Sequence, residues 1–141
     1  MEVPILRLED SVAEPAYATE GSAGFDISTA AAVEIDAGAL ATVGTGLVIA
    51  TPPGWSLLVS LRSSTPSRFG IIQPHGIGII DQDYRGPRDE IRLQLMNVRD
   101  SRITIPAGSR IAQGVFVRVA QAQWTRYEPP AESRGGFGST N

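Results

Sequence analysis

Cysteine and lysine are both absent from this chain of 141 residues, and histidine occurs once, at His75. The lack of cysteine excludes a disulfide, a thiol nucleophile, an iron–sulfur cluster and a cysteine-ligated zinc site. One histidine cannot supply a zinc site built on several histidines. The lack of lysine excludes a Walker-type phosphate loop and a Schiff-base enzyme. Carboxylates, hydroxyls and arginines remain as the groups that can carry chemistry.

Positive charge and long apolar runs are also scarce. Twelve basic residues, all arginine, face fifteen acidic ones and give a net charge of −3, which predicts no surface for nucleic acid. No segment approaches the roughly 18 consecutive apolar residues of a membrane span. The first ten residues, MEVPILRLED, lack the pattern of a signal peptide. We therefore expect a cytoplasmic protein that acts neither on nucleic acid nor in a membrane.

Glycine and proline are plentiful, with 15 and 10 residues, and they punctuate short apolar runs with a period of two. Such alternation is typical of half-buried strands, and only Ser63–Arg68 has room for a short helix. The pattern predicts an all-β sandwich or barrel. The predicted strands are Val3–Leu8, Phe25–Ile27, Val33–Ile35, Leu40–Ile49, Trp55–Leu61, Ile71–Ile72, Ile77–Ile80, Ile91–Met96, Ile103–Ile105 and Ile111–Val119.

The last thirteen residues differ from the rest, because they carry no core pattern. We expect residues 1–128 to form one β domain and residues 129–141 to leave it as an extended arm. The segment Ser133–Thr140 contains flexible glycines whose N–H groups could wrap phosphate oxygens. Its single aromatic residue, Phe137, could stack on a flat ring. A frayed tail without function is the alternative.

A second candidate site lies between Gly78 and Gly86, where an apolar strand runs into a turn with two carboxylates, a tyrosine and an arginine. In a strand, Asp81 and Asp83 would face the same side. A carboxylate near apolar residues can act as a general base. An ordinary hairpin turn has the same composition, so both interpretations stay open on these residues alone.

Three shorter patterns carry weaker signals. The Arg62 guanidinium and the neighbouring Ser63 and Ser64 hydroxyls could donate hydrogen bonds to phosphate oxygens. A solvated loop without a binding role is the alternative. Asp26, at a strand start, could hold a hydrated Mg²⁺ or stabilise a turn. Gln113 could point into a site or lie on an exposed face. A catalytic triad of Ser63, His75 and Asp81 is conceivable, but the sequence around Ser63 does not contain the G-x-S-x-G motif of such hydrolases.

Taken in order, five segments resemble the motifs of the homotrimeric dUTP diphosphatase (dUTPase) family, over residues 23 to 140. They are Ala23-Gly-Phe-Asp-Ile27, Arg62-Ser-Ser64, Gly78-Ile-Ile-Asp-Gln-Asp-Tyr-Arg-Gly86, Arg110-Ile-Ala-Gln113 and Arg134-Gly-Gly-Phe-Gly-Ser-Thr140. The resemblance implies a β-clip or jelly-roll barrel and a homotrimer with shared active sites. It implies hydrolysis of dUTP to dUMP and pyrophosphate, which keeps uracil out of DNA and supplies dUMP for thymidylate synthesis.

The resemblance also implies roles for single residues. Asp81 would be the general base that activates water, and Asp26 would hold Mg²⁺ through water. Tyr84 would pack against the deoxyribose, and main-chain groups near Gly78 would pair with uracil. The remaining substrate-binding residues would be Arg62, Ser63, Ser64, Gln113, Arg134, Phe137, Gly138, Ser139 and Thr140.

Two alternatives use the same fold. The first is a dCTP deaminase, or a bifunctional deaminase and diphosphatase, in which Glu90 is the only nearby candidate for a proton shuttle. The second is a non-catalytic protein that senses nucleotides. Asp81 and the glycine-rich arm favour a working diphosphatase, because folding requires neither of them.

Overall fold

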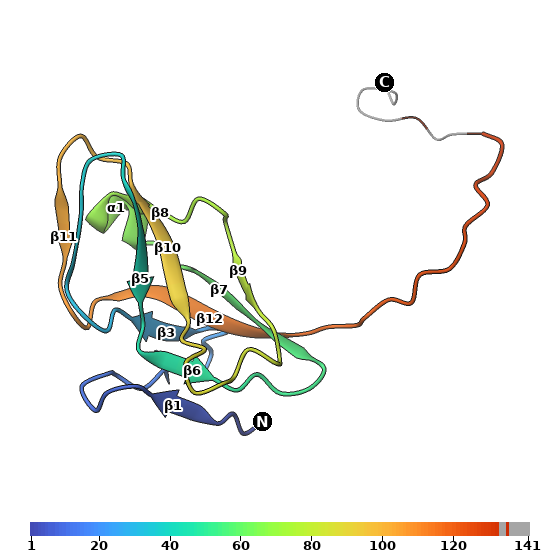
Figure 1. The fold of residues 1–141 in the computed structure, drawn as a ribbon, viewed down its shortest axis with the longest axis horizontal. Helices are drawn as coiled ribbons and strands as arrows, with labels where there is room; N and C mark the ends of the chain where they lie inside the picture. Colours follow the sequence, from blue (N-terminus) through green and yellow to red (C-terminus); the bar gives the residue numbers. More distant parts are fainter. Residues whose placement is uncertain (133–134, 136–141) are drawn as a thin grey trace.

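The computed structural model describes residues 1–132 and residue 135. This part of the chain contains twelve strands and one short helix (Figure 1). The largest sheet has five antiparallel strands in the order β2-β3-β12-β7-β9. Its strands are β2 (Ala16–Tyr17), β3 (Phe25–Ser28), β7 (Trp55–Leu61), β9 (Gly78–Ile80) and β12 (Arg110–Arg118).

Three smaller sheets complete the body. One has the order β5-β10-β8, and two others pair β1 with β6 and β4 with β11. Helix α1 (Thr65–Phe69) connects β7 to β8 and ends at Gly70, whose φ of 69° is in the left-handed region. The remaining strands are β1 (Ile5–Arg7), β4 (Val33–Ile35), β5 (Leu40–Gly44), β6 (Leu47–Ile49), β8 (Ile71–Ile72), β10 (Arg92–Asn97) and β11 (Ile103–Ile105).

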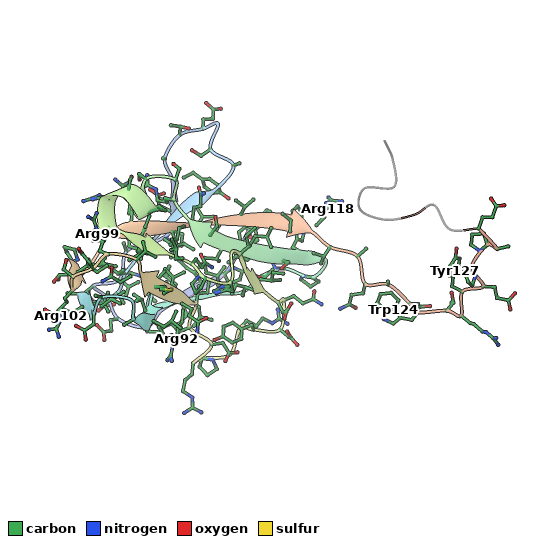
Figure 2. All side chains as sticks on the ribbon, turned by 90° about the horizontal axis from the view of Figure 1, so that it is seen from above. Arg92, Arg99, Arg102, Arg118, Trp124 and Tyr127 are labelled. Carbon is green, nitrogen blue, oxygen red and sulfur yellow. The ribbon has the colours of Figure 1, made fainter. Side chains whose placement is uncertain are left out.

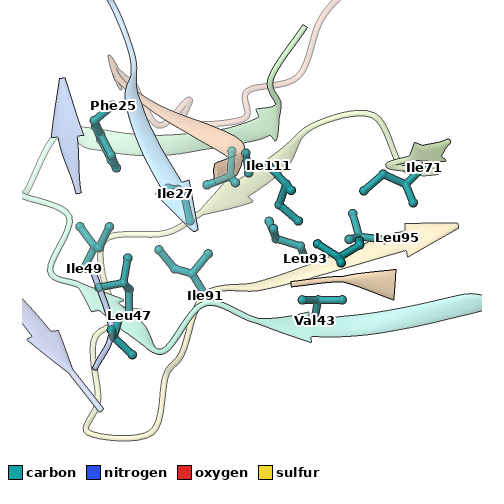
Figure 3. Close-up of a cluster of buried hydrophobic side chains, with 14 of the residues drawn as sticks. Phe25, Ile27, Val43, Leu47, Ile49, Ile71, Ile91, Leu93, Leu95 and Ile111 are labelled. Carbon is teal, nitrogen blue, oxygen red and sulfur yellow. The ribbon is translucent and has the colours of Figure 1, made fainter. Parts of the chain in front are cut away.

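The apolar core lies between these sheets (Figure 3). Strand β10 shows why the alternating pattern specifies this core, since Leu93 and Leu95 are buried while Arg92 and Gln94, which alternate with them, are exposed. Burying one such side chain contributes about 1.5–3 kcal/mol. The five-stranded sheet supplies Phe25, Ile27, Leu57, Val59 and Ile111 to the same cluster.

The predicted strands agree with the structure, because each one overlaps an observed strand and the predicted helix overlaps α1. The predicted strand Leu40–Ile49 is interrupted, however, between β5 and β6. The break includes Gly46, with a φ of 67°, where an added Cβ would overlap the Val12 side chain. Strand β2 was not predicted, because both of its residues are exposed and show no apolar alternation.

After β12 the chain continues from Val119 to Glu132 without regular structure and extends away from the sheets (Figure 1). Trp124 and Tyr127 on this stretch are 92% and 74% exposed (Figure 2). The predicted boundary between residues 128 and 129 stays a prediction. Within the described residues, no helix has the length and apolar character needed to cross a bilayer.

Asn97 is the main polar anchor inside the body, and it is 0% exposed. Its Nδ2 donates to the carbonyl oxygens of Ile35, Asp36 and Ser101 at 3.0, 3.1 and 2.8 Å. Its Oδ1 accepts from the Arg99 N–H at 2.9 Å. The end of β10 is thereby fixed to the end of β4 and the approach to β11.

The variant Asn97→Ala should lower the free energy of unfolding by about 2–4 kcal/mol, because it leaves several buried backbone groups without partners. Chemical denaturation at one fixed protein concentration measures this loss. Gln94→Ala, an exposed position on the same strand, should change stability by less than about 0.5 kcal/mol. Equal effects of the two variants would contradict the anchoring role of Asn97.

Candidate active site

Asp26 binds two arginines that come from different strands. Arg62 follows β7, and its Nε lies 3.1 Å from Asp26 Oδ1. Arg110 begins β12, and its Nη1 lies 3.1 Å from Asp26 Oδ2. The Asp26 side chain is only 14% exposed, whereas that of Arg110 is 62% exposed. These three residues, the arginine cluster, carry one net positive charge and leave guanidinium donors facing solvent.

An irregularity in β12 makes this cluster possible. Arg110 is opposite Ser28 and Gln113 is opposite Asp26, with a register shift between Arg110 and Ala112. In a regular strand, residues 110 and 113 would face opposite sides of the sheet. The extra residue in the bulge reverses that relation, so Arg110, Gln113 and Asp26 lie on one face.

Ser63 and Ser64 come directly after Arg62, at the entrance to α1, and both are exposed. Ser64 precedes the helix without a side-chain capping bond. Thr65 fixes this segment, because its Oγ1 donates to the Ile111 carbonyl at 2.7 Å. The two serine hydroxyls are therefore presented beside the arginine cluster, on a backbone tied to β12. Arginines and hydroxyls in this arrangement suit phosphate oxygens.

The segment from Gly78 to Glu90, the hairpin, begins with β9 and turns immediately after it. Tyr84 N–H donates to the Asp81 carbonyl at 3.2 Å, and Gly86 N–H donates to Asp89 Oδ2 at 2.6 Å. Asp81 and Asp83 lie beyond the end of β9, so strand alternation does not relate them. They nevertheless line one cleft, together with Trp55 and Ser56.

A second cleft of about 220 Å³ lies on the hairpin itself. Its walls include Asp81, Tyr84 and the apolar side chains of Ile79 and Ile80, and Glu90 and Arg92 complete its lining. Gly78, two residues before Ile80, has no Cβ, and one added there would lie 3.5 Å from the Val59 carbonyl oxygen. The cleft combines an exposed carboxylate, an aromatic ring and an apolar wall.

The arginine cluster and the hairpin lie at opposite ends of β7. β9 runs from Gly78, opposite Val59, to Ile80, opposite Leu57, so the chain leaves β9 in the direction away from Arg62. Arg62 lies five residues beyond Leu57 along the chain, which corresponds to roughly 15–20 Å at about 3.3 Å per residue. One chain therefore does not bring Asp81 to the arginines. The same separation rules out a Ser63–His75–Asp81 triad within one chain.

Sequence reasoning did not assign site roles to Arg110 or Gln73. Arg110 is the first residue of the fourth motif, and this position is the one feature of the sequence that could have indicated a role in the site. His75 is exposed, and its Nε2 lies 3.0 Å from Gln73 Nε2. Gln73 Nε2 also donates to the Val59 carbonyl at 3.3 Å, so the Gln73–His75 pair lies beside β7.

The described residues contain no group of three or more acidic or histidine side chains that could hold a metal ion. A Mg²⁺ ion usually keeps several waters and takes few protein ligands when phosphates supply the others. The Asp26 carboxylate fits this kind of site, because each oxygen has a further lone pair beside its arginine partner. Arg134, Phe137, Gly138, Ser139 and Thr140 lie outside the described residues.

The variant Arg110→Ala should weaken binding of inorganic tripolyphosphate about tenfold, because it removes one charge-assisted donor. Calorimetric titration of the full-length protein measures the change. Arg102→Ala is the matched control, since Arg102 is an exposed arginine paired with Glu34 and Asp36. Equal weakening by both variants would mean that only overall charge matters.

A family model described as dUTPase matches residues 10–141 of this chain. The deoxyuridine 5'-triphosphate nucleotidohydrolase of Wolinella succinogenes is 38% identical over 143 residues, covering 99% of this chain and 94% of the relative. The corresponding protein of Desulfotalea psychrophila is 37% identical over 139 residues, with coverages of 95% and 91%.

Solved structures agree with these sequence matches. The crystal structure of dUTPase from Streptococcus mutans has a TM-score of 0.80 and 30% identity, and the match covers 88% of this chain and 100% of that one. The predicted all-β dUTPase fold is therefore confirmed. The chain belongs to the dUTPase family, whose members use Mg²⁺ and hydrolyse dUTP to dUMP and pyrophosphate.

Proposed function

We propose that Asp81 is the general base of dUTP hydrolysis and that it works on a substrate held by the arginine cluster of another copy of the chain. Asp81 would take a proton from water as the water oxygen attacks the α-phosphorus. The bond between the α-phosphorus and the bridging oxygen then breaks, and pyrophosphate leaves. The observation that supports this assignment most directly is the position of Asp81 on the hairpin cleft, beside Tyr84.

The triphosphate would lie against the arginine cluster. Arg62, Ser63 and Ser64 would donate to phosphate oxygens, with Gln113 beside Asp26 on the same face of the sheet. Charge-assisted donors that are already in place stabilise the charge that develops on the leaving group. The exposed guanidinium of Arg110 adds a further donor at this position.

Asp26 would hold Mg²⁺ through metal-bound waters. When bound, the ion would neutralise charge on the phosphates. Asp26 would meanwhile keep Arg62 and Arg110 oriented, because one carboxylate oxygen faces each arginine. The residue therefore serves two purposes, and its substitution should disturb both.

The hairpin would select the base and the sugar. Main-chain groups near Gly78 would pair with uracil, and the Tyr84 ring would occupy the space that a 2′-hydroxyl needs. A pocket built to hydrogen-bond one base leaves partners unpaired when another base enters, which discriminates strongly. A cytoplasmic location fits this reaction, because its substrate is a free deoxynucleoside triphosphate.

A homotrimer would unite the parts that one chain separates. The arginine cluster would come from one copy, the hairpin from a second, and residues 129–141 from a third. Trp124, 92% exposed in the single chain, supports assembly, because a large aromatic side chain gains much from burial. Exposed Leu40 and Ile72, on strands that flank Met96 of β10, add an apolar strip.

In the arm, Phe137 would stack on uracil. The other binding residues of the arm would close over the phosphates, and they are Arg134, Gly138, Ser139 and Thr140.

The deaminase alternative is less consistent with the contacts of Glu90. Its Oε1 accepts from the Gly46 N–H at 2.7 Å, and its Oε2 lies 3.0 Å from Arg92 Nε. A carboxylate with both oxygens engaged in this way is poorly placed to carry protons to and from a base. A nucleotide-sensing protein would bind dUTP without turnover.

The variant Asp81→Asn should lose about 10²- to 10⁴-fold in kcat while retaining binding of dUTP, because it removes a general base but preserves its shape. Pyrophosphate release in the presence of Mg²⁺ measures turnover, and titration with a non-hydrolysable analogue measures binding. Unchanged turnover would remove Asp81 from the mechanism. Asp83→Asn, in the same turn, is the control.

Mixing two inactive variants tests the shared site. Trimers refolded from Asp81→Asn and Arg62→Ala chains should regain part of the activity, because some sites would combine an intact hairpin with an intact arginine cluster. Each variant refolded alone gives the baseline. No recovery, despite mixed trimers detected by mass spectrometry, would show that the two groups do not meet across chains.

Deletion of residues 133–141 should leave the fold and the trimer intact and reduce activity strongly, because the arm would no longer cover the substrate. Circular dichroism and light scattering check the first expectation, and pyrophosphate release checks the second. Normal activity of the truncated chain would contradict a role for the arm.

A further inference from the structure

We propose that Glu90 is a positioning residue that sets the selection of deoxyribose over ribose by holding the Tyr84 ring in place. The inference rests on the role of Tyr84 proposed above. The Tyr84 hydroxyl donates to the main-chain carbonyl of Glu90 at 3.0 Å. At its other end, the Tyr84 N–H donates to the Asp81 carbonyl at 3.2 Å. Tyr84 is thus held at its backbone by Asp81 and at its hydroxyl by Glu90.

The side chain of Glu90 is itself firmly held. It is 13% exposed, and its carboxylate bridges the Gly46 N–H at 2.7 Å and Arg92 Nε at 3.0 Å. Gly46 lies between β5 and β6, outside the hairpin. Gly44 makes room for the carboxylate, because a Cβ at that position would lie 2.5 Å from Glu90 Oε1. The carboxylate therefore ties the last residue of the hairpin to the body.

These contacts form a continuous path from the body to the sugar pocket. Gly46 and Arg92 fix the Glu90 carboxylate, the Glu90 carbonyl fixes the Tyr84 hydroxyl, and Tyr84 lines the cleft with Asp81. Excluding a 2′-hydroxyl by contact requires a ring that cannot retreat, and a shift of about 1 Å is enough to change a rate greatly. A ring without its anchor would make room for ribose.

Loss of the Glu90 side chain should leave the fold intact, because the next residue is held independently. Ile91 N–H donates to the Leu47 carbonyl at 2.8 Å, and the Thr45 hydroxyl donates to the Ile91 carbonyl at 2.7 Å. Ile91 N–H belongs to the same peptide group as the Glu90 carbonyl, so Leu47 holds the Ile91 side of this peptide and the Glu90 carboxylate holds its Cα side. What the variant should release is the Cα side and, with it, the position of the carbonyl that accepts from the Tyr84 hydroxyl.

The test compares kcat/KM for dUTP and UTP in the full-length enzyme with Mg²⁺. Glu90→Ala should reduce the dUTP-to-UTP ratio by at least about tenfold, mainly because UTP becomes a better substrate. Glu90→Gln keeps the shape and the acceptor for Gly46 and loses only the charge facing Arg92, so its effect should be smaller. Asp89→Ala is the matched control, since Asp89 caps Gly86 in the same turn and should leave the ratio unchanged.

A double-mutant cycle tests whether Glu90 acts through Tyr84. Tyr84→Phe removes only the hydroxyl, so its effect on the ratio should not add to that of Glu90→Ala. Additive effects, or an unchanged ratio in Glu90→Ala, would overturn the inference. General destabilisation would instead lower kcat/KM for both substrates together, and if it obscures Glu90→Ala, Glu90→Gln with Tyr84→Phe decides. A wild-type enzyme without dUTP turnover would overturn the proposed function rather than this inference.

Discussion

The position of β12 between β3 and β7 is the constraint on which the arginine cluster depends. β12 pairs with β3 on one side and with β7 on the other, so residues far apart in the chain meet along it. Asp26, Arg62 and Arg110 come together only because both pairings hold their register. A slip of one residue would turn every side chain of β12 to the other face. The core that fixes this register is therefore also what fixes the charge pattern of the site.

The same sheet also separates the arginine cluster from Asp81 within one chain. Arg62 follows the C-terminal end of β7, whereas β9 pairs with the middle of β7 and runs toward its N-terminal end, so the turn after β9 points away from the arginines. A rigid sheet cannot fold back to close such a gap. The proposed assembly of several copies would close this gap without deformation, and it would offer a partner to the exposed aromatic residues beyond β12. Activity and oligomeric state would then be inseparable.

Within the hairpin, rigidity comes from polar contacts rather than from burial. Asp81 and Tyr84 are exposed, yet Tyr84 has hydrogen bonds at both its backbone and its hydroxyl. Glu90 links these contacts to Gly46 in the body. A general base, the role proposed for Asp81, must remain open to water and substrate, so apolar packing cannot enclose it. Hydrogen bonds from a fixed neighbour supply the order that packing would supply elsewhere.

Most of the strands were predictable from the sequence, because a period of two and turn-forming glycines act locally, whereas β2 and the break between β5 and β6 were not. Leu93 and Leu95 were predictable as an inward-facing pair, and Asp81 and Arg62 were recognisable from their motifs. Tertiary structure decided what these residues touch. The bulge that turns Arg110 toward Asp26 depends on pairing between strands distant in the chain, and the Glu90 carboxylate likewise meets Gly46 only in the folded chain. No local pattern encodes such pairings, because their register is set by packing across the whole core.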